Sequence, residues 1–420
     1  MIPRLLALCA SLALALSLAS LSHAAATATP AAKPLLDKNN NPEGFKTLAI
    51  GDAAPDFSLP GIDGKTYSLR DFAGPDVLMV LFTSNHCPTS HGIEKRLQKL
   101  RDDFRHQSFA LVAINPNHPD GLSLDELGYG EFNDSFEEMK PYAESNGWDF
   151  PYLYDGDKQL TARAYGCLAT PHVFIFDKQR KLRYAGRFDD SRFPQEDTVK
   201  SPDARNAVTA LLAGKPVPVE LTKPHGCSTK WREKRAKHQA WEASWKDLPV
   251  TIEGIDNEGI AALRKNPTNK FRLINVWATW CAPCVEEFPD LIMLSRRFNM
   301  RPFELITLSM DDERAEPRAK AFLEKQGAGL TKHVTDRLKP EGRTTNHYRY
   351  TGGSQDEVVA ALDSQWPGPI PHTILVAPGG EIVWRHNGVI DPEAALKAIV
   401  EAMTPYYQPQ PKPATVAISK

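Results

Sequence analysis

The sequence predicts two α/β domains built on one plan, each with a β-sheet covered by helices on both faces. In both halves of the 420-residue chain, strand-like runs alternate with helical segments, and each half finishes in two strands and a helix. The stretches LFTSNHCPTSHG (81–92) and VWATWCAPCVEEFP (276–289) both pass from an apolar strand through a turn into a helix. The spacing also repeats, because 84 residues separate Cys87 from Pro171 and 87 separate Cys284 from Pro371. We therefore interpret the chain as a divergent tandem repeat.

Residues 1–24 are predicted to be a signal peptide. Arg4 precedes an apolar run from Leu5 to Leu21, and small residues follow as far as Ala24, after which we expect cleavage. The alternative is a membrane anchor, for which this run is short. The prediction is a periplasmic or secreted protein that contacts a membrane only during export.

The first domain is predicted at residues 48–222, after an Ala-, Pro- and Asn-rich linker at 25–47 that we expect to be disordered. Its expected strands are KTYSL, DVLMVLFT, SFALVAINPN, HVFIFDKQ and KLRYAGRF, the last two of which follow Pro171. Its expected helices lie at about 88–105, 135–146, 159–166 and 203–212.

The second domain is predicted at residues 248–405, with strands FRLINVWA, FELITLSMD, HTILVAPGG and EIVWRHNGV. Helices are expected at about 281–298, across PRAKAFLEKQ, and at 392–403, and a turn at 378–380 joins the last two strands. A charged, tryptophan-containing helical connector is expected at 223–247, and a disordered, proline-rich tail at 406–420.

Cysteine usage points to redox chemistry rather than to a disulfide scaffold. Cleavage would remove Cys9 and leave five cysteines, an odd number that is too small to staple a protein of this size. Cys281 and Cys284 form a Cys-x-x-Cys motif where a strand meets a helix, and a helix N-terminus stabilises a thiolate. Half of a zinc site and a static bridge are the alternatives, but no second pair of ligands has suitable spacing for zinc.

The stretch WATWCAPC resembles the thioredoxin superfamily, and specifically the exported TlpA-like thiol-disulfide reductases, over about residues 248–403. The resemblance implies a thioredoxin fold in which Cys281 is the nucleophile and Cys284 resolves the mixed disulfide. It also implies that Glu287 relays a proton, with a solvated helix glutamate as the alternative, and that Pro371 follows a cis peptide bond. Trp280 is expected to be a partly exposed lid beside the site.

The first domain resembles the AhpC/TSA-type redoxins in the stretches GDAAPDFSLPGIDGKTYSL and ATPHVFIFDKQRKLRYAGR, the second of which contains Pro171. Relatives often have a cysteine where this chain has Ser84, so the motif is interpreted as Ser-x-x-Cys, ending at Cys87. Three interpretations stay open: Cys87 is a peroxidatic cysteine, it pairs with Cys227 or Cys167, or this domain is a silent binding module. Cys167 is also expected to be a small buried hydrophobic residue.

The predicted function is an exported thiol-disulfide oxidoreductase that exchanges disulfides with protein substrates through Cys281 and Cys284 and contributes to cell redox homeostasis. The expected partners are protein thiols or disulfides and a redox partner protein. A net charge of −2 gives no reason to expect nucleic acid, and we expect no cofactor and no metal. The alternatives are a thiol peroxidase with antioxidant activity at Cys87, and a redoxin-like binding scaffold. The direction of exchange stays open.

Overall fold

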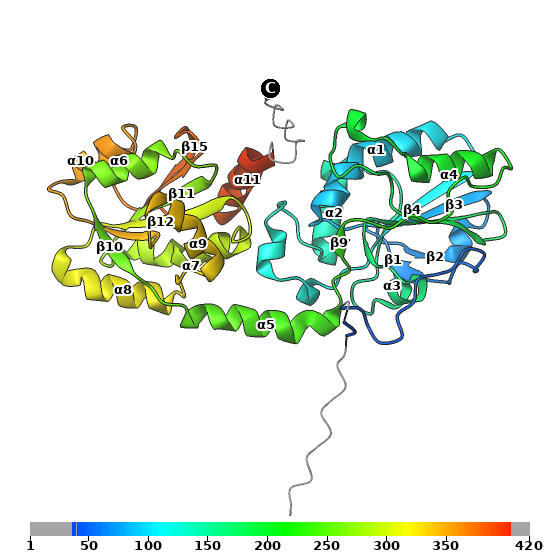
Figure 1. Ribbon diagram of the computed structural model, residues 1–420, viewed down its shortest axis with the longest axis horizontal. Coiled ribbons are helices and arrows are strands. Elements are labelled where there is room, and N and C mark those ends of the chain that lie inside the picture. The colour runs from blue at the N-terminus through cyan, green and yellow to red at the C-terminus, as the bar shows by residue number, and fades with distance from the viewer. Residues whose placement is uncertain (1–35, 39, 405–420) are drawn as a thin grey trace, which may run out of the picture. The chain divides into compact units, whose positions relative to one another are not determined.

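The computed structural model describes residues 36–38 and 40–404, which form two α/β domains joined in the chain by helix α5 (Arg235–Ser244) (Figure 1). The predicted signal peptide, the predicted linker up to residue 35 and the predicted tail at 406–420 lie outside the described residues.

The first domain contains a five-stranded mixed sheet in the order β5-β4-β3-β7-β8. Strands β3 (Val77–Phe82), β4 (Phe109–Asn115) and β5 (Tyr152–Tyr154) are parallel to one another. Strand β7 (His172–Phe176) pairs antiparallel with β3, and β8 (Leu182–Gly186) pairs antiparallel with β7. A small ribbon joins β1 (Ser58–Pro60) to β2 (Thr66–Ser68), and another joins β6 (Ala169–Thr170) to β9 (Cys227–Ser228).

Alternation along β3 explains how this sheet is covered on both faces. Val77, Met79 and Leu81 pack under helices α1 (Pro88–Phe104), α2 (Phe136–Ser145) and α4 (Asp203–Leu212). The intervening residues of β3 point to the opposite face, where α3 (Leu160–Tyr165) and the segment before β1 cover them. Because side chains of a strand alternate between faces, a wholly apolar strand requires a cover on each side.

The second domain repeats this arrangement with a sixth strand, in the order β10-β13-β12-β11-β14-β15. Strands β10 (Ile252–Ile255), β11 (Phe271–Trp277), β12 (Phe303–Ser309) and β13 (His347–Tyr350) are parallel, and β14 (His372–Val376) and β15 (Ile382–Asn387) are antiparallel to their neighbours. Helices α7 (Ala282–Arg297), α8 (Glu316–Lys325) and α11 (Pro392–Met403) pack on one face. Helices α6 (Asn257–Lys265) and α10 (Gln355–Leu362) pack on the other, and α9 (Lys332–Leu338) precedes β13.

Charged residues are buried at one end of this second sheet. Arg272 and Glu304 face each other across β11 and β12, and Arg272 Nε donates to Glu304 Oε1 at 2.7 Å. Lys270 lies 3.2 Å from the same carboxylate, and both cations also pair with Glu341. The Glu304 carboxylate is 3% exposed, and Arg343 Nη1 lies 2.9 Å from it as a third cation, so these three side chains balance its buried charge.

The described structure differs from the predicted limits of the linker and connector. Within the segment expected to be a disordered linker, Phe45 packs edge-on against Trp231 at 5.6 Å, and Thr47 Oγ1 donates to Gly166 O at 2.8 Å. Within the expected connector, residues 227–231 belong to the first domain, and Trp231 is fully buried there. Apolar side chains explain both differences, because burying them offsets the entropy lost on ordering the segment.

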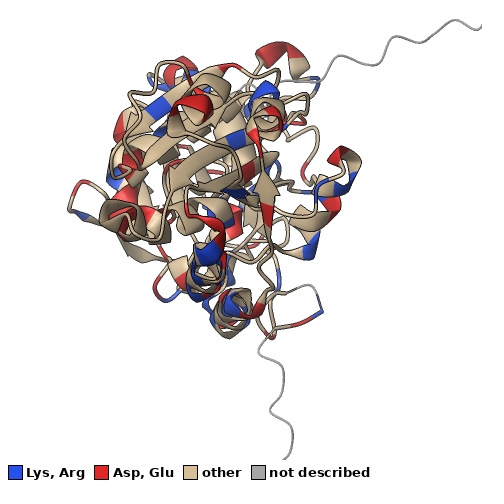
Figure 2. Ribbon diagram, turned by 90° about the vertical axis from the view of Figure 1, so that its left-hand side faces the viewer, with Lys and Arg blue, Asp and Glu red and all other residues tan. Residues whose placement is uncertain are grey.

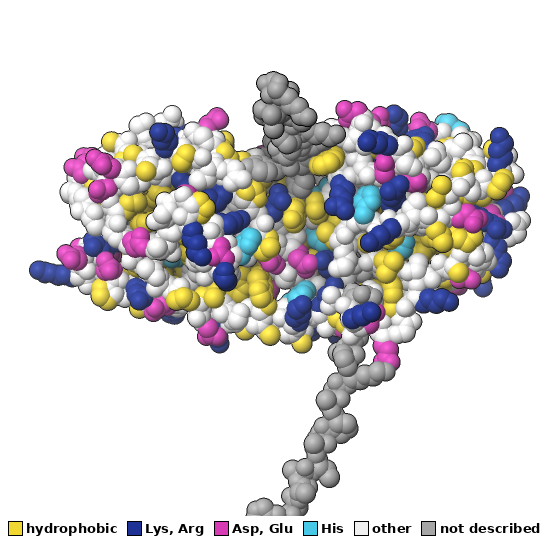
Figure 3. All heavy atoms as spheres, viewed as in Figure 1, with side chains coloured by type: hydrophobic (Ala, Val, Ile, Leu, Met, Phe, Trp, Pro, Cys, Tyr) yellow, Lys and Arg dark blue, Asp and Glu magenta, His cyan; other side chains and the backbone are white. Residues whose placement is uncertain are grey.

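Acidic and basic residues are interspersed over the faces of the molecule that Figures 2 and 3 show. Among the residues that the structure describes, no helix has both the length and the apolar character needed to span a bilayer.

Candidate functional site

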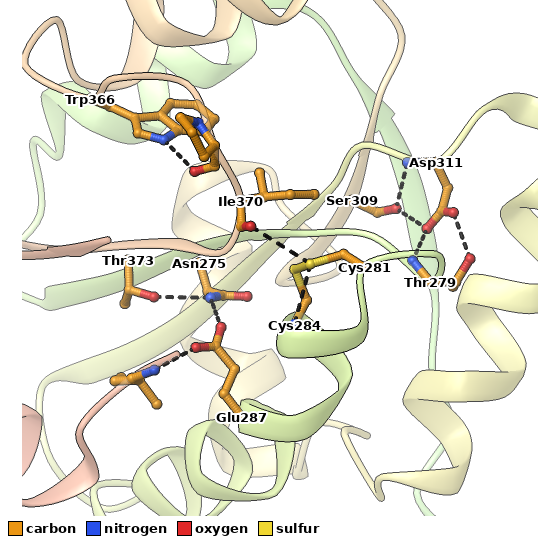
Figure 4. Close-up of a disulfide and its surroundings, with 12 residues drawn as sticks. Asn275, Thr279, Cys281, Cys284, Glu287, Ser309, Asp311, Trp366, Ile370 and Thr373 are labelled. Carbon is orange, nitrogen blue, oxygen red and sulfur yellow. Dashed lines mark hydrogen bonds between the residues drawn. A yellow bond between two sulfur atoms is a disulfide. The ribbon is translucent and has the colours of Figure 1, made fainter. Parts of the chain in front are cut away.

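Cys281 and Cys284 form a disulfide where β11 leads into α7 (Figure 4). Cys281 is the N-cap residue of α7, and its sulfur accepts a hydrogen bond from the backbone N–H of Cys284 at 3.3 Å. Pro283 in the first turn removes an N–H that has no partner inside the helix. Cys284 is fully buried and Cys281 is 6% exposed, so an approaching thiol would meet the Cys281 sulfur first.

The loop before β14 lies against the Cys281 sulfur. Ile370 and Pro371 are joined by a cis peptide bond, and the Ile370 carbonyl oxygen is 3.8 Å from Cys281 Sγ. The indole N–H of Trp366 donates to Pro369 O at 2.8 Å and so fixes this loop (Figure 4). Trp280 is 64% exposed next to the disulfide, as expected for a lid, whereas the preceding tryptophan of the motif is buried.

A buried carboxyl group lies one helical turn beyond Cys284. Glu287 is 1% exposed, and its Oε1 accepts from Asn275 Nδ2 and its Oε2 from the Ile390 N–H, each at 2.7 Å. Asn275 Nδ2 also donates to Thr373 Oγ1 at 2.9 Å, so β11 and β14 hold the carboxyl from the sheet side (Figure 4). Burial raises the pKa of Glu287 to about 7, although both hydrogen bonds favour the ionised form. Within the described chain, neither carboxyl oxygen bonds to a cysteine sulfur.

Asp311 holds the turn that carries Cys281. The backbone N–H and hydroxyl of Thr279 donate to its two carboxylate oxygens at 2.9 and 2.6 Å, and Ser309 Oγ donates at 2.8 Å (Figure 4). Asp311 is 2% exposed. Sequence reasoning missed this residue because it follows β12, and only the parallel pairing of β11 and β12 brings it to the motif.

The sheet register corrects the predicted match between the two motifs. Phe82 pairs with His172 in the first domain, and Val276 pairs with His372 in the second. Cys87 and Cys281 both follow these strand residues by five positions, and each is the N-cap of the next helix. Cys87 therefore occupies the place of the first cysteine, not the second.

Ser90, rather than Ser84, stands where the second cysteine would be. It is the third residue of α1, it is buried, and its backbone N–H is one of the groups that lower the pKa of Cys87. Ser84 Oγ instead shares a hydrogen bond of 2.9 Å with Thr170 Oγ1. The motif of the first domain is thus Cys-Pro-Thr-Ser. It could have been found by aligning the helix starts instead of the Cys-x-x-Cys spacing.

The structure brings Cys227 to Cys87. Strand β9 pairs with β6 so that Cys227 lies opposite Thr170, beside the cis bond to Pro171. The Cys87 thiol donates to Thr170 O at 3.0 Å, and the Cys227 N–H donates to Cys87 Sγ at 3.4 Å. Both sulfurs are free thiols here; Cys87 is fully buried and Cys227 is partly exposed.

The two thiols differ in acidity. Burial opposes ionisation of Cys87, but hydrogen bonds from the Cys227 thiol, the charge of His86 and the N–H groups of Ser90 and Cys227 hold its pKa well below the usual value. The pKa of Cys227 is raised, because its thiol hydrogen-bonds to Cys87 and is buried beside that charge. His86 Nδ1 lies 2.5 Å from the buried carboxylate of Asp134, which the sequence did not single out.

Cys167 does not join this pair in the structure. It is fully buried, its thiol donates to Ala169 O at 3.3 Å, and Thr229 Oγ1 donates to its carbonyl at 2.7 Å. Burial raises its pKa to about 12, which fits a small buried hydrophobic residue better than a nucleophile. No group of three or more potential metal ligands is found among residues 36–38 and 40–404.

Comparisons with known proteins give matches in both domains. A model of the AhpC/TSA family matches residues 50–185, and a model of the redoxin family matches residues 256–402. The "Putative peroxiredoxin" of Mycobacterium tuberculosis (strain ATCC 25618 / H37Rv) is 32% identical over 124 residues, which are 28% of this chain and 66% of that protein. The chain thus spans just under two thirds of the length of that relative.

A second relative is "Thiol-disulfide oxidoreductase ResA" of Geobacillus thermodenitrificans (strain NG80-2). It is 26% identical over 136 residues, which are 32% of this chain and 68% of that protein. Among solved structures, a hypothetical protein from Sinorhizobium meliloti 1021 is 35% identical, with 44% of this chain and 97% of that chain covered and a TM-score of 0.40.

Proposed function

Because the chain belongs to the thioredoxin superfamily, as an AhpC/TSA-family domain followed by a redoxin domain, we propose that it exchanges disulfides with protein substrates through Cys281 and Cys284. The predicted family resemblances, the tandem thioredoxin-like fold and the oxidoreductase class are confirmed by the family matches and by the relatives named above. The observation that carries the proposal is the disulfide at the start of α7, with Cys281 at the helix N-cap and its partner fully buried.

In the reducing direction, the Cys281 thiolate attacks one sulfur of a substrate disulfide, and the other substrate sulfur leaves as a thiolate. The Cys284 N–H and the start of α7 stabilise negative charge on Cys281 before the attack. The Cys284 thiol then loses its proton and attacks Cys281 Sγ, which closes the disulfide and releases the second substrate thiolate. The opposite direction uses the same steps in reverse.

Two groups around the disulfide suit a protein substrate. The loop at Ile370 and Pro371 presents a backbone carbonyl at the Cys281 sulfur, and Trp280 offers a large exposed apolar surface beside it. We further propose that Glu287, whose pKa lies near neutrality one helical turn beyond Cys284, takes up or gives the proton of that buried thiol at physiological pH. The partners are a protein thiol or disulfide and a second redox protein that resets the pair.

Export of the chain, with cleavage after Ala24, is part of this proposal, and it rests on the sequence of residues 1–24 alone. The expected location is the periplasm or the exterior. N-terminal sequencing of the mature protein, isolated from its native cell envelope or medium, is expected to begin at Ala25. A mature chain that still begins at Met1 would contradict export by this route.

The test of the activity is reduction of a disulfide-bonded protein such as insulin in the presence of a chemical reductant. Cys281→Ser is expected to abolish the catalysed rate, and Cys284→Ser to accumulate a mixed disulfide on Cys281 that mass spectrometry detects. Cys167→Ser is the matched control, because its thiol is buried in the other domain. A Cys281→Ser variant with the full rate would refute the proposal and favour a binding scaffold with a static bridge.

A thiol peroxidase centred on Cys87 is the second candidate, because a relative carries the name of a peroxiredoxin and the AhpC/TSA model matches this domain. Peroxide consumption that is lost in Cys87→Ser and kept in Cys281→Ser would support it. Peroxide consumption unaffected by Cys87→Ser would exclude it.

A further inference from the structure

We propose that Cys87 and Cys227 form a second dithiol-disulfide centre, in which the chain's own segment around Cys227 occupies the place of a bound protein substrate. This centre lies in the first domain and does not depend on the function proposed for Cys281 and Cys284. Its sulfurs come from segments 140 residues apart in the sequence.

The backbone around Cys227 pairs where a substrate chain would pair. Residues 227–228 form an antiparallel ladder with 169–170, directly before the cis bond to Pro171. In the second domain, no described strand pairs with Ile370, the residue at the corresponding position, so that edge is left for an external chain. The first domain thus fills this edge with its own C-terminal segment, and a cysteine of that segment faces the N-cap cysteine.

Gly226 makes this close approach feasible. A Cβ atom at this position would lie 2.0 Å from the carbonyl oxygen of Thr170 and 3.0 Å from the ring of Pro171. The residue has a φ of 156°, which L side chains rarely adopt. A glycine immediately before Cys227 is therefore required for β9 to lie against β6, and it sets the position of the Cys227 sulfur next to Cys87.

Because Ser90 is not a cysteine, Cys87 can form a disulfide only with a cysteine from elsewhere in the chain. The serine occupies the third position of α1, where the second domain has Cys284, so no sulfur is available one turn into the helix. The Cys227 thiol instead hydrogen-bonds to Cys87. Joining the two thiols removes two protons and two electrons, which a more oxidising protein disulfide accepts as it becomes a dithiol.

Exposure decides which sulfur reacts with a partner protein. Cys87 is fully buried, whereas Cys227 is partly exposed. An incoming thiolate therefore reaches the Cys227 sulfur of the oxidised pair. Cys87 is the better leaving group, because N–H groups and the start of α1 stabilise its thiolate.

A protein dithiol reduces the oxidised Cys87–Cys227 pair in two steps. A thiolate of a protein dithiol bonds to Cys227 Sγ, the Cys87–Cys227 bond breaks, and its electron pair leaves on Cys87. The second thiol of the partner loses its proton and attacks the partner sulfur bound to Cys227, and Cys227 leaves and takes up a proton. The partner dithiol is oxidised by two electrons and becomes a disulfide, and the pair is reduced by two. A more oxidising protein disulfide reverses these steps and restores the pair.

The experiment uses the full chain with Cys281→Ser and Cys284→Ser, so that the first domain holds the redox-active cysteines. The protein is equilibrated in reduced and oxidised dithiothreitol over a range of ratios, quenched with acid, alkylated and digested for mass spectrometry. A peptide that links Cys87 to Cys227 is expected to approach one per chain in oxidising buffers and to disappear in reducing ones. Its fraction gives the potential of the pair directly.

Further variants separate pairing from folding. Cys167→Ser is expected to retain the linked peptide, and Gly226→Ala is expected to lower its yield at least tenfold, because the added Cβ displaces β9. Circular dichroism of each variant reports whether the fold is kept. In otherwise native chains, insulin reduction by the second domain should stay unchanged in Cys227→Ser, which keeps this result distinct from that of the proposed function.

Native-state alkylation tests which sulfur partners meet. Cys227 in a Cys87→Ser chain is expected to react at least tenfold faster than Cys87 in a Cys227→Ser chain. The proposal is overturned if no disulfide forms at any ratio, if Cys87 links to Cys167, or if Cys87 is the faster thiol.

Discussion

Replacement of Glu287 by glutamine is expected to change how the stability of the second domain depends on pH. Glu287 is 1% exposed, and burial raises its pKa from 4.5 to about 7. The folded domain therefore holds a proton between pH 4.5 and 7 that the unfolded chain releases. In this range the wild-type free energy of unfolding falls as pH rises, because the folded state binds more protons.

The magnitude follows from the shift. One pKa unit corresponds to about 1.4 kcal/mol, so a rise from 4.5 to about 7 corresponds to about 3 kcal/mol. This contribution is fully present below pH 4.5 and is lost once the pH has passed about 7. Glutamine has nearly the same shape and cannot ionise, so Glu287→Gln should not undergo this loss. The free energy of unfolding of the variant minus that of the wild type should rise by about 3 kcal/mol between pH 5 and pH 8.

The assay must report the second domain alone, since two domains need not unfold together. Denaturant-dependent hydrogen exchange, followed by mass spectrometry of peptides from β11 and α7, gives the free energy of opening of this domain. The disulfide is kept oxidised throughout so that no thiol titrates. Glu286→Gln is the matched control, because Glu286 is the exposed neighbour on the same helix. A difference between Glu287→Gln and wild type that stays flat from pH 5 to 8 would refute the reasoning.

Three further changes test other parts of the structure. Asp311→Ala should lower the free energy of unfolding by about 2 kcal/mol and slow insulin reduction, because the turn before the disulfide loses its buried hydrogen-bond acceptor; exposed Glu313→Ala should do neither. Glu304→Gln should cost about 3–5 kcal/mol in chemical denaturation at pH 7, because the buried cations Lys270, Arg272 and Arg343 lose one carboxylate and are left to share Glu341. Ser90→Cys should divert Cys87 to a partner one helical turn away, which peptide mass spectrometry would detect as a new linkage that replaces the distant one.

The predictions for Asp311→Ala, Glu304→Gln and Ser90→Cys can each be contradicted by one result. An Asp311→Ala variant with unchanged insulin reduction would mean that the turn is held without its carboxylate. A loss below about 1 kcal/mol for Glu304→Gln would mean that solvent screens the buried cluster. If Ser90→Cys left the distant linkage intact, the register of the two motifs inferred from the sheet would be incorrect.

Local pattern was enough to predict the elements that position the site. The apolar run DVLMVLFT became β3, and the helix expected at about 281–298 is α7 (Ala282–Arg297). The cis bond before Pro371 was expected only through the family resemblance, because spacing alone carries no information about the isomer, and the one before Pro171 was not predicted. Shorter elements with weak patterns, such as α9 and β13, were not predicted. Their positions depend on contacts with the rest of the sheet.

Features that depend on distant pairing could not be read from the sequence. Matching the motifs by the interval between cysteines placed Ser84 opposite Cys281, whereas pairing across the sheet places Ser90 opposite Cys284. The two alternatives differ by three residues along the turn. The strand partners His172 and His372 decide between them, and so do the helix starts, where Cys87 and Cys281 are the N-cap residues. The buried acceptor Asp311 was likewise hidden, because it lies 30 residues beyond Cys281 in the sequence.

Replacing a cysteine by serine at the third helical position changes more than the number of sulfurs. In the second domain, the N-cap sulfur of Cys281 is the accessible one and Cys284 is buried, so exchange begins at the helix start. In the first domain, the N-cap sulfur of Cys87 is fully buried beneath β9, and Cys227 is the accessible one. A helix N-terminus stabilises whichever thiolate it holds. It therefore favours the attacking thiolate of a reduced pair in the second domain and the leaving thiolate of an oxidised pair in the first. The second centre is thus suited to pass electrons to a substrate disulfide and the first to accept them from a partner dithiol, although both are built on the same strand-turn-helix unit.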